Sequence, residues 1–383
     1  MALLRLRLLP VALLASALLL TLGASTAVPT AESRLPGKPG IGIAERALSK
    51  GKKGKCRQAR RCKRRQSAGA RPIYWGALIH DQLNGEQVPW DMGGARQLEA
   101  MLGKKMSLIH FMAPFAECGS SGCSYYRFPD EEMQTIRNHG AIPFFSWSSQ
   151  AIPSREVQPD FELSDVISGR YDGFIRDWAR DARDWGHPFF LRFNWEMNGD
   201  WFPWSEGVNG NQRGEFVTAW RHVHDIVSGV GATNATWVWC PNVDFEGVFQ
   251  DLAEVYPGDS YVDWTGLDGY NSGTNPAKKD RWRTFDQLYE RTYDEIVQNV
   301  APSKPMVIGE IASTEQGGSK AQWIGEMLKA LPSRYPKIRG LVWFDKFESG
   351  MDWPIETSAS AIDAFARGVR GAAYRGSVVS FGG

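Results

Sequence analysis

The sequence predicts an α/β fold in which residues 72–383 form a single (β/α)8 barrel. Eight apolar runs of strand length are spaced along this region, and amphipathic stretches of helical period lie between them. Strands that alternate with helices form a parallel sheet, and eight such units close into a barrel. The region shows no internal repeat, no low-complexity stretch and no second linker. Its length therefore suits one barrel better than two small domains.

The predicted strands fall at regular intervals, and the longest stretches between them have helical period. The strands are residues 73–79, 106–112, 141–147, 188–194, 236–240, 262–268, 305–310 and 338–345. Helices are predicted at residues 171–185, 213–227, 285–299 and 321–331. A doubly wound open sheet is the alternative fold, but no glycine-rich phosphate turn follows the first predicted strand.

The N-terminus has the pattern of an export signal, residues 1–27. Arg5 and Arg7 precede an apolar run at residues 8–22, and Ser25-Thr26-Ala27 is a small-residue cleavage site. An uncleaved anchor is the alternative, but the run is short for a membrane span. We expect a secreted, extracellular protein with no stable membrane insertion after cleavage.

Residues 28–71 are predicted to be a basic, disordered linker. Eleven Lys or Arg and no Asp or Glu lie between Lys50 and Arg71, and like charges at this density disfavour a compact fold. A solvated leader is favoured over a tether to nucleic acid or an anionic wall. Residues 72–383 then hold 28 basic and 41 acidic residues, a formal net charge of −13. We do not expect this domain to bind nucleic acid.

Five cysteines are too few to form a disulfide framework in 383 residues. Cys118 and Cys123 lie in one short loop, and export favours a disulfide there over a metal site. Cys56 and Cys62 flank part of the basic run and could also pair. Cys240, on the fifth predicted strand, is expected to be a buried free thiol.

Polar and aromatic residues gather where the predicted strands end, which is the face that carries the active site in barrels. Any one of them could be a satisfied core residue, but packing does not explain the pattern at all eight strand ends. These residues are Trp75, His80, His110, Trp147, Asn194, Glu196, Asn242, Asp268, Tyr270, Glu310, Trp343 and Asp345.

The most informative stretch is residues 189–204, a buried strand followed by Glu196, a turn and aromatic residues. A carboxyl group among aromatic rings is poorly solvated, so its pKa should rise and it can stay protonated near neutral pH. A general acid needs that property, and a sugar ring packs well on aromatic faces. A structural glutamate paired with Arg192 is the plainer interpretation.

This stretch resembles glycoside hydrolase family 26, which contains β-mannanases and some β-glucanases and xylanases. The family pattern is Arg-x-x-His-Glu-Met-Asn-Gly-x-Trp-Phe-x-Trp, and the resemblance extends over residues 73–355. The matching residues are Arg192, Glu196, Met197, Asn198, Gly199, Trp201, Phe202 and Trp204. Trp195 stands where the family usually has His, which puts the family's mannan specificity in doubt. Asn194 or His110 could supply the polar sugar contact instead.

The resemblance implies a second catalytic carboxyl and a set of sugar contacts. Glu310 follows a Pro-x-x-apolar run and matches the family's nucleophile on the seventh strand, while Glu196 matches the acid/base. Tyr270 is expected to hold Glu310 by a hydrogen bond. Trp343 is expected to form the floor at the scissile bond. Further platforms for neighbouring sugars are expected at Trp147, Trp201 and Trp204.

The resemblance therefore implies a secreted retaining endo-β-glycanase that hydrolyses β-1,4-linked polysaccharide, with β-mannan as the first candidate. A mixed-linkage β-glucanase or xylanase of the same family is an alternative. A non-catalytic carbohydrate-binding barrel is another, although it would be expected to lack one of the two carboxyls. A surface-tethered adhesion protein is a third. We expect a monomer that needs no cofactor and no metal.

Overall fold

The computed structural model describes residues 72–83, 85–244, 251–276, 278, 280–348 and 350–381. The predicted export signal and basic linker, with Cys56 and Cys62, lie outside these residues. Within the described ranges, no helix is both long enough and apolar enough to cross a membrane.

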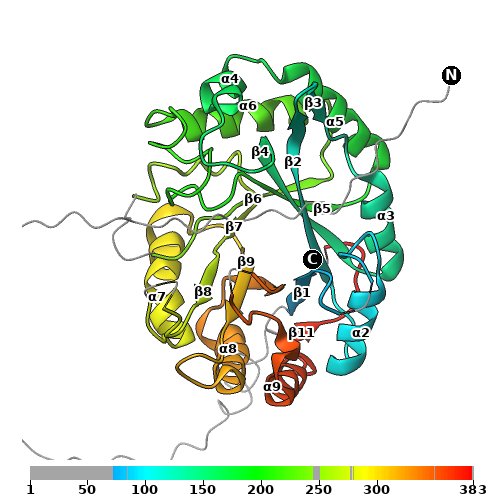
Figure 1. Ribbon diagram of the computed structural model, residues 1–383, viewed down its shortest axis with the longest axis vertical. Coiled ribbons are helices and arrows are strands. Elements are labelled where there is room, and N and C mark those ends of the chain that lie inside the picture. The colour runs from blue at the N-terminus through cyan, green and yellow to red at the C-terminus, as the bar shows by residue number, and fades with distance from the viewer. Residues whose placement is uncertain are drawn as a thin grey trace, which may run out of the picture. The chain divides into compact units, whose positions relative to one another are not determined.

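In the described part of the chain, eight parallel strands close into a barrel, which confirms the predicted fold class (Figure 1). Around the barrel the order is β1, β2, β4, β5, β6, β7, β9 and β10, and the pairing of β1 with both β2 and β10 closes it. The strands are β1 (Ile73–Ile79), β2 (Leu108–Gly119), β3 (Gly122–Tyr125), β4 (Ile142–Ile152), β5 (Phe189–Phe193), β6 (Ala235–Trp239), β7 (Trp264–Gly266), β8 (Gly269–Asn271), β9 (Met306–Ser313), β10 (Ile338–Asp345) and β11 (Tyr374–Arg375).

Helices surround the strands, as Figure 1 shows. They are α2 (Gly93–Leu102), α3 (Asp130–His139), α4 (Leu163–Ile167), α5 (Asp172–Trp185), α6 (Glu215–Gly229), α7 (Phe285–Glu295), α8 (Lys320–Arg334) and α9 (Ala359–Val369). Short helical turns are η1 (Pro159–Phe161), η2 (Ile296–Val300) and η3 (Ile355–Thr357).

The barrel strands are apolar on both faces because both faces are buried. Every residue of β1 and β5 is buried, because one face of each strand fills the barrel and the other packs under helices. The helices bury only one stripe. In α5 this stripe is Ile175, Trp178, Ala179 and Ala182, and the helix ends at Gly186, whose φ of +72° suits glycine.

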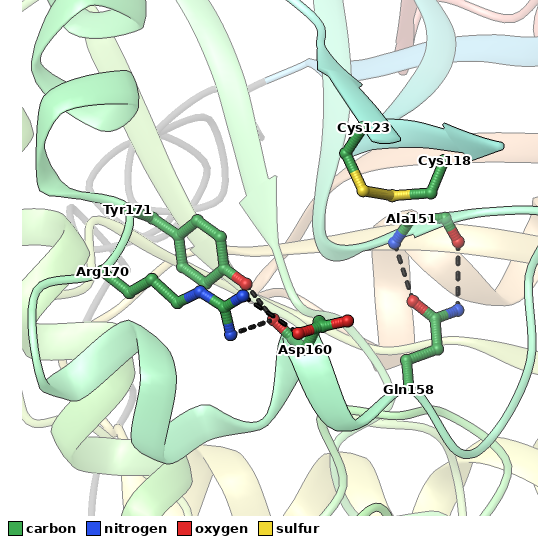
Figure 2. Close-up of a disulfide and its surroundings, with 7 residues drawn as sticks. All are labelled: Cys118, Cys123, Ala151, Gln158, Asp160, Arg170 and Tyr171. Carbon is green, nitrogen blue, oxygen red and sulfur yellow. Dashed lines mark hydrogen bonds and ion pairs between the residues drawn. A yellow bond between two sulfur atoms is a disulfide. The ribbon is translucent and has the colours of Figure 1, made fainter. Parts of the chain in front are cut away.

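Strands β2 and β4 are longer than predicted, because they continue past the barrel and pair with each other as far as Glu117 and Ile152. Beyond this point β2 turns back into β3, and the predicted disulfide between Cys118 and Cys123 joins the two strands of this hairpin (Figure 2). Cys240 is a buried free thiol, as predicted.

The loop after β4 is tied to the extended strand by a side chain that acts as a strand partner. Gln158 accepts from the backbone N–H of Ala151 at 2.8 Å and donates to its carbonyl at 3.0 Å (Figure 2). Further along the loop, Asp160 pairs with Arg170 at 2.9 Å, and its carbonyl accepts from Tyr171. These contacts hold the rim beside the barrel mouth.

Two irregularities in the barrel strands aim side chains at the mouth. The sixth barrel strand is split into β7 and β8, and Asp268 lies at the break, where its N–H donates to the carbonyl of Pro241 at 2.9 Å. On β9 the register advances from Ile308 to Ile311 while β10 advances by only two residues, so a bulge contains Glu310. Bulges of this kind re-aim a side chain next to a site.

Candidate active site

Three carboxyl groups meet at the carboxyl ends of the barrel strands. Glu196 follows β5, Asp268 lies between β7 and β8, and Glu310 lies in the bulge of β9. One oxygen of each lies within 4.8 Å of the others, and all three side chains are buried. The structure therefore brings together the two carboxyls that the sequence singled out.

Arg192 on β5 forms ion pairs with two of these carboxyls. Its Nη1 donates to Asp268 at 2.6 Å, and its Nη2 donates to Glu310. Its Nε donates to Ser146 at 2.7 Å, so each guanidinium nitrogen has a partner. Burial alone would lower the pKa of Arg192, but the charges of Asp268 and Glu310 outweigh burial and raise it. The guanidinium stays charged.

Glu310 is held on its other side by Tyr270 of β8, whose hydroxyl donates to the second carboxylate oxygen. Burial, followed by the charges of Glu310 and the neighbouring carboxyls, raises the pKa of Tyr270 well above 10. The phenol therefore keeps its proton and remains a donor. Arg192 and Tyr270 together fix both oxygens of Glu310.

Residue 309, next to Glu310, is a glycine, and the polar network occupies the space that a Cβ would need. A Cβ built on Gly309 would lie 2.7 Å from Oδ1 of Asp268 and 2.9 Å from Nη1 of Arg192. It would also lie 3.0 Å from Sγ of Cys240. Glycine at position 309 therefore allows β9 to approach the guanidinium and its partners closely.

The backbone at Glu196 adopts an uncommon conformation, with φ at +54°, which non-glycine residues seldom adopt. Two asparagines hold the turn in place. Asn194 accepts from the N–H of Ser149 at 2.9 Å, which fastens the end of β5 to β4. Asn198 donates to the carbonyl of Asn242 at 2.9 Å and accepts from its N–H at 2.8 Å. Residue 196 thus lies between contacts to β4 on one side and to the loop after β6 on the other.

The pKa of the Glu196 carboxyl is raised well above its ordinary value. Burial is the largest cause, and the charges of Asp268 and Glu310 add to it. The indole N–H of Trp201, 2.7 Å from Oε2, opposes the shift because it stabilises the ionised form. Glu196 therefore holds a proton more readily than an ordinary glutamate, as the sequence predicts.

Asp268 and Cys240 complete the floor of the site. Burial raises the pKa of Asp268, Arg192 lowers it and Glu310 raises it again, which leaves it at about 7. The Cys240 thiol donates to Oδ1 of Asp268 at 3.0 Å, and burial raises its pKa well above the usual range. The thiol is thus a neutral donor.

A cluster of three carboxyls could in principle hold a metal ion. Here the guanidinium of Arg192 already lies against Asp268 and Glu310, so a divalent cation bound by all three carboxyls would face a buried positive charge. The donor set of this cluster therefore does not suit a metal.

Trp195 packs against the site instead of opening onto it. Its ring lies 4.8 Å from the guanidinium carbon of Arg192, and its side chain is 3% exposed. Its carbonyl accepts from the indole of Trp204 at 2.7 Å, and its ring also packs on Phe202. The tryptophan covers the guanidinium that holds Glu310.

The expectation that Trp147, Trp204 and Trp343 contact sugars is not met, because all three rings are buried against protein. Trp147 stacks on Trp178 of α5 at 4.1 Å, under the helix layer. Trp343 faces the helices too, where it packs on Phe365 of α9. Trp204 stacks on Phe202 within its own loop. Trp201 alone among the expected platforms is partly exposed beside a carboxyl.

His110 and Asn194 do not supply a sugar contact either. Both side chains are fully buried. His110 lies inside the barrel, with Nε2 at 2.8 Å from Ser146 and 3.4 Å from Arg192. Burial, then the nearby guanidinium, lowers its pKa well below 6.5, so the ring is neutral. The amide of Asn194 is used on Ser149.

Three residues at the site were missed by sequence reasoning about site roles. The sequence pattern marks Asp268 only as a polar residue at a strand end. Its position two residues before Tyr270 is the feature that could have indicated a role in the site. Phe344 and Trp353 both pack on the ring of Tyr270, with centroids 5.6 Å and 5.4 Å away. Trp353 lies in the loop after β10, where apolar periodicity gives no guide.

Enzymes that cleave glycosidic bonds use two carboxyls about 5–5.5 Å apart when they retain configuration. The barrel and its carboxyl pair thus have the geometry of a glycoside hydrolase site. The sequence agrees, because residues 153–323 match the family described as glycosyl hydrolase family 26. Residues 153–323 are therefore similar to this family.

Curated relatives include an endoglucanase and a mannanase. Endoglucanase H of Acetivibrio thermocellus is 32% identical over 272 residues, which cover 70% of this chain and 28% of that protein. A mannan endo-1,4-beta-mannosidase of Bacillus subtilis is 27% identical over 187 residues, 46% of this chain and 45% of the relative. The chain spans less than half the length of either relative.

Solved structures share the fold. The catalytic domain of an endo-beta-1,4-mannanase from Bacillus sp. JAMB-750 superposes with a TM-score of 0.62 at 16% identity, covering 80% of this chain and 87% of that chain. A modular endo-beta-1,4-mannanase from Cellulomonas fimi has a TM-score of 0.58 at 17% identity and covers 81% and 75%.

Replacement of Trp201 by Phe should move the alkaline limb of the pH profile to higher pH. Phenylalanine keeps an aromatic ring but lacks the N–H that stabilises ionised Glu196. The pKa of Glu196 therefore rises, and its protonated form persists to higher pH. The profile of kcat/KM against pH on a soluble polysaccharide measures the shift.

Trp204→Phe is the matched control, because that indole donates to a carbonyl and not to a carboxyl. It should leave the limb in place. A limb that does not move, or moves to lower pH, in Trp201→Phe would contradict this account of the Glu196 environment.

Proposed function

We propose that this protein is a retaining endo-β-glycanase that cleaves β-1,4-linked polysaccharide by double displacement. The observation that carries the proposal is the unequal environment of two carboxyls whose oxygens lie within 4.8 Å. Glu310 is fixed by a cation and a phenol, whereas Glu196 is buried and has no cation partner in the part of the chain that the structure describes. Two carboxyls in environments that separate their protonation states are the mark of an acid and nucleophile pair.

In the first step, ionised Glu310 attacks the anomeric carbon and the bond to the leaving oxygen breaks. Protonated Glu196 gives its proton to that oxygen, so the shortened polysaccharide leaves as an alcohol. Arg192 and Tyr270 orient the attacking carboxylate. Because the donors are already in place, the site needs little rearrangement as charge moves.

In the second step, the sugar is bound to Glu310 as an ester. Glu196, now ionised, takes a proton from a water molecule, and the water oxygen attacks the anomeric carbon. Glu310 leaves as a carboxylate between Arg192 and Tyr270. Two inversions at one carbon return the original configuration.

For the substrate we propose β-mannan first and β-glucan second. The mannanases among the relatives support mannan. Similarity to endoglucanase H extends over more of this chain, and Trp195 replaces the histidine usual in the family pattern, which together support a glucan. Initial rates on β-mannan, mixed-linkage β-glucan and β-1,4-xylan discriminate between these substrates.

We further propose that the protein acts outside the cell as a monomer. The export pattern at residues 1–27 supports secretion, and the acidic barrel domain supports a neutral polysaccharide as its partner. The basic linker is proposed to be dispensable for catalysis, because the residues that form the described carboxyl cluster and its contacts all lie within residues 72–383.

Glu310→Ala should abolish turnover while the barrel stays folded, because the glycosyl ester cannot form. Sodium azide should partly restore cleavage of an activated aryl glycoside and give a glycosyl azide of inverted configuration. Glu326→Ala, an exposed position on α8, is the matched control and should retain activity. Wild-type turnover in Glu310→Ala would exclude the mechanism.

Glu196→Gln should affect substrates unequally. Polysaccharides need their leaving oxygen protonated, so their cleavage should fall by about 10²–10⁴-fold. Aryl glycosides with good leaving groups need no such help in the first step, and a burst of phenol should precede slow turnover. Stopped-flow absorbance detects the burst. Equal losses on both substrate types would make Glu196 a binding residue instead.

A further inference from the structure

The loop after β10 supplies a wall to the active site. Trp353 in this loop is buried, and its ring packs against Tyr270 at a centroid distance of 5.4 Å. Tyr270 in turn donates to Glu310. The position of the phenol, and so of its bond to the carboxylate, depends on where this loop places the indole.

A buried lysine holds that loop. Lys320 is the first residue of α8, and its side chain is fully buried. Its ammonium donates to three successive carbonyls, those of Asp352 at 2.6 Å, Trp353 at 3.1 Å and Pro354 at 2.5 Å. It also lies 3.0 Å from the hydroxyl of Thr357. An ammonium has three N–H donors, so this cradle uses all of them.

Other groups fix the same segment around the ammonium. The N–H of Ile355 donates to Asp345 at 2.7 Å, and the indole of Trp343 donates to the carbonyl of Trp353 at 3.0 Å. Asp352 accepts from the N–H of Glu315 at 3.0 Å, just beyond β9. The loop is therefore tied to β9, β10 and α8, and the lysine lies where these ties meet.

The charge on Lys320 is maintained near neutral pH. Burial lowers its pKa, nearby carboxyls oppose the shift, and the result is about 8. The acidic groups that face it are Asp352, Asp345, Glu315 and Glu356. A buried ammonium needs hydrogen bonds and compensating negative charge, and here carbonyls supply the hydrogen bonds while nearby carboxyls supply the charge.

We propose that Lys320 is a positioning residue for the reaction, acting through the loop that carries Trp353. Its ammonium fixes the carbonyls of residues 352–354, which seats the indole against Tyr270 and so holds the phenol on Glu310. The inference rests on the proposed function, because it assumes that Glu310 is the reacting carboxylate. Lys320 lies outside the reaction centre and touches none of the three carboxyls there.

Lys320→Met should lower kcat by about 10²-fold, because a small displacement of an orienting group costs that much. Methionine has similar length and no donors. Steady-state kinetics on the best polysaccharide of the panel measure the effect, with thermal unfolding run in parallel so that assays stay well below the transition. Lys329→Met is the matched control, since this lysine lies exposed on the same helix. It should keep wild-type kcat.

A double-mutant cycle separates positioning from a merely structural role. In a Tyr270→Phe background, the hydroxyl that Lys320 is proposed to position is absent. Lys320→Met should then lower kcat by no more than about twofold, which is within the error of such a cycle. Equal losses with and without the Tyr270 hydroxyl would overturn the proposal, as would a wild-type kcat in the single variant.

Lys320→Gln provides a second variant if the methionine variant does not fold. It should show the same dependence on the Tyr270 hydroxyl, and hydrogen exchange of residues 350–358 should be faster than in wild type. Unchanged exchange and unchanged kcat would overturn the inference alone. Inactivity of the unmutated protein on every polysaccharide would instead contradict the proposed function, and the inference with it.

Discussion

The pairing of buried Arg192 with Asp268 and Glu310 is the interaction on which the barrel mouth depends. A guanidinium removed from water is tolerated only with ionic partners, and loss of one partner of a buried pair typically costs about 3–5 kcal/mol. The constraint extends through the surrounding chain. The sixth barrel strand is broken at Asp268, β9 has a bulge at Glu310, and a side chain at position 309 would collide with the network. Trp195 covers the guanidinium from the loop after β5.

The same interaction makes the surroundings of the three carboxyls unequal. Three carboxyls within a few ångströms repel one another when ionised, so a proton is favoured on at least one of them. Arg192 lies against Asp268 and Glu310, whereas among the described residues the hydrogen-bond partner of the Glu196 carboxyl is the indole N–H of Trp201. Burial and its neighbours' charges therefore raise the pKa of Glu196. The proposed mechanism uses this difference, with Glu196 as the acid and Glu310 as the carboxyl that Arg192 orients.

All eight barrel strands were predictable because each contains an apolar run that is mostly buried on both faces. Because the strands are buried on both faces, the sequence does not show whether Trp147 and Trp343 point into the barrel or towards the helices. A strand that is apolar on both sides does not reveal which residues face the barrel and which face the helices. Trp343 packs on α9, whereas its neighbour Phe344 packs on Tyr270. Trp353 and Lys320 were missed because their positions depend on a loop and on long-range hydrogen bonds, which have no sequence period.

The central claim is that Glu310, oriented by Arg192 and Tyr270, is the group that bonds to the sugar. The most direct measurement is mass spectrometry after incubation with a 2-deoxy-2-fluoro glycosyl fluoride of the preferred substrate, followed by peptide mapping. The 2-fluorine slows both formation and hydrolysis of the ester, whereas the fluoride leaving group speeds up formation alone, so the intermediate should accumulate. The account predicts one added glycosyl group, on the peptide that contains Glu310. A label on Glu196, or rapid turnover of the natural substrate with no label on any carboxyl, would contradict it.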